Sequence, residues 1–156
     1  MTIEKMIRKH LNGETKETAL GFIAYLNANE MTPKQWFNSD FWRIPYENFY
    51  LCGIHLRKDS WHFWFWSGDY SGELDDAFIK AVHDHVGTCV SCHGDNTDIC
   101  PKGKTQTVFG KEFANACIQF TVQFENPDGN ALEQIKKLIK YWKTAAPNEF
   151  SWHYRD

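Results

Sequence analysis

The sequence of 156 residues lacks any long apolar run. No apolar stretch approaches the length of ~18 residues that a membrane-spanning helix requires. Residues 1–13 contain no apolar segment of the kind found in a secretory signal peptide. Basic residues are not in excess, because the formal net charge is -3, whereas nucleic-acid-binding domains normally carry a basic face. We therefore expect a cytoplasmic protein with neither a membrane nor a nucleic-acid partner.

Recognisable catalytic motifs are also missing. No G-x-S-x-G nucleophile motif occurs, and no pair of acids specifies an acid–base dyad. Gly103-Lys104-Thr105 is similar to the end of a phosphate-binding P-loop, but Asp98 stands where that motif needs its first glycine. The sequence therefore identifies no catalytic residues.

Apolar residues at helical spacing predict four longer helices and one short one. The first follows Thr2 as N-cap and stops at Gly13, and the second follows Thr15. Thr32-Pro33-Lys34-Gln35 has the form of a capping box and predicts the short helix. Further helices are expected over 74–85 and, after Asn126-Pro127-Asp128, over a segment that Pro147 closes.

Aromatic and branched residues predict a β-meander over 41–46, 49–57 and 61–66, with a turn at 58–60. Two C-terminal strands are expected at 105–109 and 118–124. Strands joined by tight turns pair antiparallel, so we predict an α+β fold with helices packed mainly on one face of the sheet. The chain should form a single domain over 1–156, with a cysteine-rich loop at 87–117.

Four of the five cysteines flank or occupy this polar loop, in the pattern C-x2-C-x7-C-x16-C. Reduced thiolates that converge from a loop are typical zinc ligands, and the ion would order backbone that packing cannot hold. We therefore predict one zinc ion, with His93 as the substitute if one thiol points away. The predicted ligands are Cys89, Cys92, Cys100 and Cys117.

Cys89 and Cys92 allow two other interpretations. With His93 they spell the C-x-x-C-H pattern of covalent haem attachment, but no export signal accompanies it. A thiol-redox pair is the second alternative, although such pairs sit at a helix N-terminus and this one follows a predicted C-terminus. A loop of unligated thiols remains the plain alternative to a metal.

Tryptophan is abundant, with seven residues, and four of them are candidates for the wall of a ligand cleft. An aromatic stripe on a strand is more often part of a core than of a ligand site. His55 and His62 should face each other across the hairpin, as site residues or as cross-strand packing. The candidate ligand-binding residues are Trp36, Trp42, Trp64 and Trp66.

Several segments carry a resemblance to a known group of proteins. They are Pro101 to Lys104, the run Thr107-Val108-Phe109-Gly110-Lys111-Glu112-Phe113, the start Phe124-x-Asn126-Pro127-Asp128, and the helix from Ala19 to Leu26. In these segments the chain resembles an uncharacterised family of small proteins from clostridia and related Gram-positive bacteria. The resemblance implies a shared architecture and no mechanism.

These observations favour a zinc-stabilised cytoplasmic module that binds a small ligand or a partner. An enzyme or thiol-redox protein that uses Cys89 and Cys92 is the alternative. Nucleic-acid contact is a third possibility, which the net charge disfavours. The basic residues available for that contact are Arg57, Lys58, Lys102, Lys104 and Lys111.

Overall fold

A computed structural model describes residues 1–37, 39–47, 49–65, 72–87, 103–117 and 121–149. These residues form two compact units, one of Met1–Phe63 with Glu125–Asp156 and one of Trp64–Phe124. The boundary falls within two strands, β4 (Ser60–Phe65) and β7 (Val122–Glu125). Each unit is described by itself below, and a single domain over 1–156 stays a prediction.

The predicted α+β class is confirmed. One sheet has the strand order β1-β2-β3-β4-β7, and a separate two-stranded sheet pairs β5 with β6. The pairs β1–β2, β2–β3 and β5–β6 are antiparallel. Strands β2 (Phe41–Tyr46) and β3 (Phe49–Arg57) lie close to their predicted bounds. Strand β4 lies inside the sheet and is buried on both faces from Trp61 to Phe65, as expected of a run without polar alternation.

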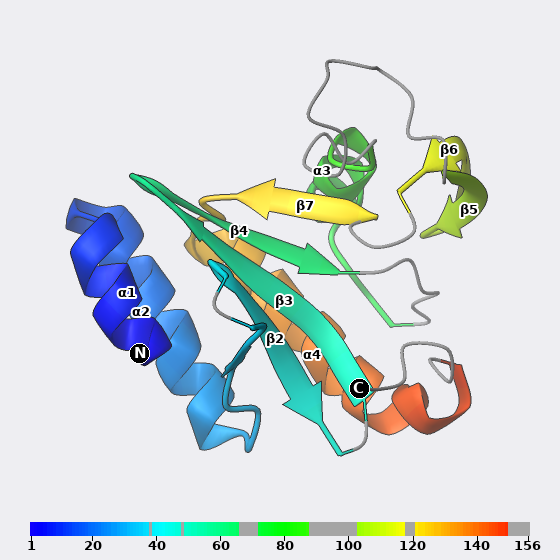
Figure 1. Ribbon diagram of the computed structural model, residues 1–156. Helices are drawn as coiled ribbons and strands as arrows, with labels where there is room; N and C mark the ends of the chain where they lie inside the picture. The colour runs from blue at the N-terminus through cyan, green and yellow to red at the C-terminus, as the bar shows by residue number, and fades with distance from the viewer. Residues whose placement is uncertain (38, 48, 66–71, 88–102, 118–120, 150–156) are drawn as a thin grey trace. The chain divides into compact units, whose positions relative to one another are not determined.

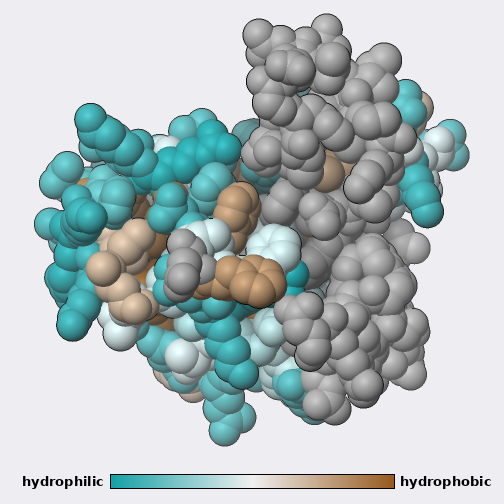
Figure 2. Space-filling view, viewed as in Figure 1, coloured by the Kyte–Doolittle hydropathy of each residue, from teal (hydrophilic) through white to brown (hydrophobic). Residues whose placement is uncertain are grey.

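The first unit begins with two helices. In α1 (Ile3–His10), Thr2 acts as the predicted N-cap, because its side chain accepts a hydrogen bond from the Lys5 backbone N–H. Helix α2 (Gly13–Ala28) starts at Gly13, earlier than predicted, and Gly13 adopts a positive φ of 54°. The two helices contact each other (Figure 1). Figure 2 shows mainly hydrophilic surface over them.

The core of this unit lies between the sheet and helices α2 and α4 (Gly129–Glu149). Phe22 of α2 packs edge-on against Phe63 at 5.6 Å and lies 5.9 Å from Trp61, measured between ring centroids. Helix α4 contacts β3 and passes behind the sheet in Figure 1. The apolar face predicted for this helix is buried. It consists of Leu132, Ile135, Leu138, Ile139 and Trp142.

Two predictions about this unit are wrong. The capping box at Thr32–Gln35 starts no helix: Lys34 and Gln35 form strand β1 (Lys34–Gln35) and pair with Arg43 and Trp42. Hydrogen bonds to β2 outweigh the local helix signal, because the isolated helix would be very short. Pro147 does not close the last helix either, since α4 continues to Glu149.

The second unit contains α3 (Asp76–Asp84), β5 (Lys104–Val108) and β6 (Lys111–Ala116). Asp75 is the N-cap of α3, where its carboxylate accepts the Phe78 backbone N–H at 2.8 Å. Strands β5 and β6 form a tight hairpin, in which Val108 pairs with Lys111 across Phe109 and Gly110. Both turn residues have positive φ, 44° and 76°, as a two-residue type I′ turn requires.

The hairpin is fixed to α3 through His83. The Nε2 of this histidine lies 2.9 Å from the Val108 carbonyl oxygen, and its ring lies 5.5 Å from that of Phe113. Strand β7 begins at Val122, after Thr121, and residues 118–120 of the strand predicted over 118–124 lie outside the described residues. Among the described residues, no helix is long and apolar enough to cross a membrane.

Candidate functional site

Of the predicted zinc ligands, Cys117 is described, whereas Cys89, Cys92, Cys100 and the substitute His93 lie outside the described residues. Cys117 follows β6 and is 2% exposed. Its carbonyl oxygen accepts hydrogen bonds from Gln106 Nε2 at 2.9 Å and from Thr121 Oγ1 at 2.8 Å. Its backbone is therefore held firmly.

The chain on both sides of residues 88–102 is fixed near Cys117. On the entering side, the Cys117 backbone N–H donates to the Gly87 carbonyl oxygen at 3.2 Å. On the leaving side, Gly103 lies so close to Asn115 that an added Cβ would be 2.6 Å from the Asn115 carbonyl oxygen. The next residue, Lys104, pairs with Ala116. The stretch with three of the four cysteines thus begins and ends beside the fourth.

The described residues alone contain no group of three or more His, Cys, Asp or Glu side chains that could hold a metal. Because three of the predicted ligands are not among them, the zinc site stays a prediction.

Of the four candidate tryptophans, the two in the first unit, Trp36 and Trp42, do not form one wall. Trp42 and Trp64 are each 3% exposed. Trp36 is half-buried, with its ring 6.3 Å from Phe41 and the Arg43 guanidinium carbon 3.9 Å from its centroid. Because Phe41 and Trp42 are neighbours on β2, they point to opposite faces of the sheet. Trp66 lies outside the described residues, and the cleft beside it stays a prediction.

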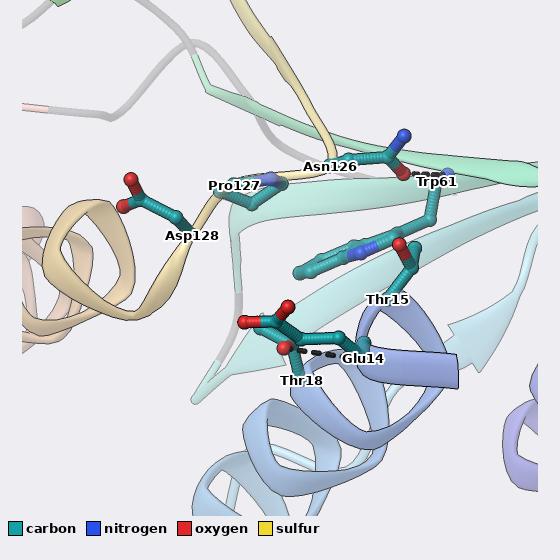
Figure 3. A pocket seen from close by; sticks show the side chains of 7 residues that line it. All are labelled: Glu14, Thr15, Thr18, Trp61, Asn126, Pro127 and Asp128. Atoms are coloured by element: carbon teal, nitrogen blue, oxygen red, sulfur yellow. Dashed lines mark hydrogen bonds between the residues drawn. The ribbon is translucent and has the colours of Figure 1, made fainter. Parts of the chain in front are cut away.

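The first unit contains a cavity that the sequence did not point to. Its volume is about 220 Å³. The lining residues come from the first turns of α2, the start of β4 and the segment that leads into α4 (Figure 3). They are Glu14, Thr15, Thr18, Trp61, Asn126, Pro127 and Asp128. We call this cavity the Trp61 pocket.

A reciprocal pair of hydrogen bonds builds one wall of the pocket. The Trp61 backbone N–H donates to Asn126 Oδ1 at 2.9 Å, and the Asn126 backbone N–H donates to the Trp61 carbonyl at 2.8 Å. Asn126 has a φ of 45°, a conformation that asparagine tolerates better than most residues. The chain then turns through buried Pro127 into α4, where Asp128 Oδ1 caps the helix by accepting the Ala131 N–H at 2.8 Å.

The first turns of α2 form the facing wall. The Thr18 hydroxyl donates to the Glu14 carbonyl at 2.8 Å, so it is already engaged within the helix. Glu14 is exposed at the pocket rim, whereas Thr15 and Thr18 are half-buried. The N-cap residue Asn12 makes no side-chain hydrogen bond to the helix start.

Trp61 carries the most informative polar atom of the pocket. The residue is 1% exposed, and its Nε1 is buried with no hydrogen-bond partner in the described part of the chain. Figure 3 shows the indole ring extending from β4 over the first turn of α2, with Pro127 nearby. A buried N–H without a protein partner is normally satisfied by what fills the adjacent space, water or a ligand.

The predicted facing of His55 and His62 is confirmed, with ring centroids 6.0 Å apart. His55 also stacks on Phe41 at 3.8 Å and accepts the Arg57 Nε–H at its Nδ1 over 3.4 Å. Burial, with the Arg57 and His62 charges, lowers the pKa of His55 to about 4. Burial and Arg57 likewise lower the pKa of His62, against the opposing effect of Glu125. This pair is cross-strand packing that resists protonation.

Comparison of the chain with protein-family models, curated proteins and solved structures found no match. The resemblance to the clostridial family therefore stays a prediction, and the candidate site depends on its own geometry. The sequence signal for the Trp61 pocket was only partial. Asn126-Pro127-Asp128 predicted a helix start, but the Trp61–Asn126 pairing joins positions 65 apart along the chain.

Proposed function

We propose that this protein is a small-molecule-binding module and that the Trp61 pocket is its binding site. The observation that carries the proposal is that Trp61, whose buried N–H has no partner among the described residues, lines a pocket. The buried Nε1 atoms of Trp36 and Trp42 have no described partner either, but these residues do not line this pocket. Leaving such a donor unsatisfied costs roughly 1–3 kcal/mol. A ligand with a hydrogen-bond acceptor recovers part of this energy on binding.

The size of the pocket supports a small ligand. Its volume of about 220 Å³ lies below the ~300–1,000 Å³ of sites for drug-sized molecules. The walls come from a strand and two helix starts that hydrogen bonds and packing hold in place, so the pocket is largely pre-formed. A six-membered ring with a few polar substituents matches this size.

The test uses protein labelled with ¹⁵N at the tryptophan indoles. A screen of small polar molecules should move the Trp61 indole resonance in a saturable way and leave that of Trp142 unmoved. Trp142 is a suitable reference because it is equally buried in α4 and does not line the pocket.

Matched variants separate binding from stability. Trp61→Phe removes the N–H and with it the indole resonance, so binding to both variants is measured by calorimetry. Trp61→Phe should abolish or strongly weaken binding, while Trp142→Phe makes the same change in the core and should leave binding intact. If no compound moves the Trp61 resonance, or if both variants bind equally well, the pocket is not the binding site.

We further propose a structural zinc ion held by Cys89, Cys92, Cys100 and Cys117, with His93 replacing one thiolate if needed. Gly87 and Gly103, which border the cysteine segment, are both fixed near Cys117, and we call this arrangement the closed base. The closed base supports the zinc proposal, because it limits how far the four cysteines can lie from one another. Thiolate ligands require a reducing compartment, and we propose the cytoplasm. A thiol-redox role for Cys89 and Cys92 is the alternative, in which these thiols would be reactive and metal-free.

A further inference from the structure

The charge of the Trp61 pocket narrows the class of ligand. Among the residues that the structure describes, its lining includes two carboxylates, Glu14 and Asp128, and no lysine, arginine or histidine. An anionic ligand would lie beside both carboxylates without a compensating cation. The pocket therefore disfavours anions and favours a positive charge.

Two helix starts at the pocket do not reverse this conclusion. Helix N-termini attract anions through their free N–H groups and the helix dipole. Here the chain supplies its own acids: Asp128 caps α4 through its Oδ1, and Glu14 lies in the first turn of α2. These carboxylates already occupy the role that a bound anion would take.

Trp61, which also lines the pocket, calls for a different group on the ligand. The buried Nε1 of Trp61 is a donor and requires an acceptor. Asn126 Oδ1 is already engaged by the Trp61 backbone N–H, and the Thr18 hydroxyl by Glu14. A ligand should thus present an acceptor oxygen to the indole and a cation to the exposed carboxylates.

We propose that the Trp61 pocket takes a small amino alcohol, a protonated amine with a neighbouring hydroxyl group. This inference rests on the proposed binding function and specifies its ligand. The hydroxyl oxygen accepts from Trp61 Nε1, and the ammonium group lies near Glu14 and Asp128. Because both acids are exposed, their contribution is modest and falls as salt is added.

Three cyclohexane derivatives of similar size test the need for the hydroxyl and the need for the charge separately. They are trans-2-aminocyclohexanol, which has both groups, cyclohexylamine, which lacks the hydroxyl, and trans-1,2-cyclohexanediol, which lacks the charge. Titration at low salt, followed by the Trp61 indole resonance, should rank the amino alcohol first. We expect the diol to bind about fivefold more weakly because it loses the ionic attraction. We expect a similar loss for cyclohexylamine, which offers the indole no oxygen.

Charge-neutralising variants identify the source of the preference. Glu14→Gln combined with Asp128→Asn should make the amino alcohol and the diol bind about equally. The asparagine still caps α4, so the helix start is kept. Glu17→Gln is the matched control, because it removes a charge from α2 at a residue outside this pocket and should keep the fivefold preference.

The outcomes distinguish the two proposals. If the diol binds the unaltered protein as tightly as the amino alcohol, the ligand class is wrong and the binding function stands. If none of the three compounds, nor any in the wider screen, moves the Trp61 resonance, both fail. If the preference survives in the double variant and 0.5 M salt leaves it unchanged, Glu14 and Asp128 do not confer it and the inference is overturned.

Discussion

The core of the first unit and the β5–β6 hairpin of the second depend on different sources of stability. In the first unit, helices α2 and α4 bury large side chains such as Phe22 and Trp142 against or beside a sheet. In the second, hairpin β5–β6 buries only Val108 and Ala116 of its strand residues. A two-stranded ribbon with so little buried surface is marginal by itself. The second unit also has buried rings, among them Phe65, Phe78 and Phe124. The comparison therefore indicates that hydrophobic burial stabilises the first unit, whereas the hairpin of the second depends on specific contacts.

Within the second unit, a few specific contacts hold the hairpin and the ends of the cysteine segment. His83 holds the hairpin turn through the Val108 carbonyl, and Phe109 lies 6.5 Å from Phe65, measured between ring centroids. Gly87 and Gly103 are fixed beside Asn115 and Cys117. A metal bound at the base of the cysteine segment would tie these links together, as metal binding couples to folding in small domains.

The largest expected effect tests this difference directly. Removing the proposed zinc with a chelator, or changing Cys117 to Ser, should lower the free energy of unfolding by more than about 3 kcal/mol and release about one zinc per chain. Thermal melting with metal analysis measures both. Hydrogen exchange should accelerate in β5 and β6 before it does in α4.

The matched control is Cys52, which is buried in β3 and lies in the first unit. Burial raises the pKa of the Cys52 thiol well above its usual value, so this group is a poor metal ligand. Cys52→Ala should keep the full zinc content. Metal-free protein with four titratable thiols at positions 89, 92, 100 and 117, and an unchanged melting temperature, would disprove the zinc proposal.

The next effect concerns the packed core of the first unit. Phe22→Ala removes a ring that contacts both Trp61 and Phe63 and should cost about 3–5 kcal/mol. Phe113→Ala, in the half-buried β6 position against His83, should cost about 1 kcal/mol. Urea unfolding compares the two. Equal costs would show that burial does not distinguish the units.

Sequence reasoning succeeded where side chains are periodic and largely buried. The meander, α3 and the apolar face of α4 follow hydrophobic spacing that burial enforces, so these elements appear close to their predicted positions. It failed for β6, where Lys111, Glu112 and Asn115 are exposed and leave no buried alternation. It failed at Lys34 and Gln35 because their pairing with β2 is a tertiary effect.

The two candidate sites also differ in how much of each could be predicted from the sequence. Cysteine spacing draws attention to Cys117 because thiolate chemistry is visible in residue type alone. The Trp61 pocket is invisible in the sequence, since it needs α2, β4 and the Asn126 turn to meet. Its key property, an indole N–H without a described partner, belongs to the folded arrangement.

A smaller effect comes from the glycines that border the cysteine segment. Gly103→Ala places a methyl group against the Asn115 backbone and should cost about 1–3 kcal/mol while weakening zinc retention. Gly87→Ala is the matched control on the other side, because a Cβ there meets none of the described residues within 4 Å, and it should be nearly neutral. Melting temperature and the rate of zinc loss to a chelator compare them. Identical behaviour of the two variants would argue against a closed base.

The smallest expected effect is the acid sensitivity of the first unit. Because burial and Arg57 lower the pKa of His55 to about 4, the folded protein resists a proton that the unfolded chain accepts near pH 6.5. The free energy of unfolding should therefore fall as the pH drops from about 6.5 to 4 and change little from this source below 4. His62 acts in the same direction. Since His55 is partly exposed, we discount its share of the change in unfolding free energy to about 1 kcal/mol.

The variant His55→Phe tests this source of acid sensitivity. It keeps a ring against Phe41 and removes the titrating group, so urea unfolding across this pH range should show a shallower decline in stability than in the unaltered protein. An equally steep decline in the variant would place the acid sensitivity elsewhere, and a rise in stability on acidification would contradict the lowered pKa itself.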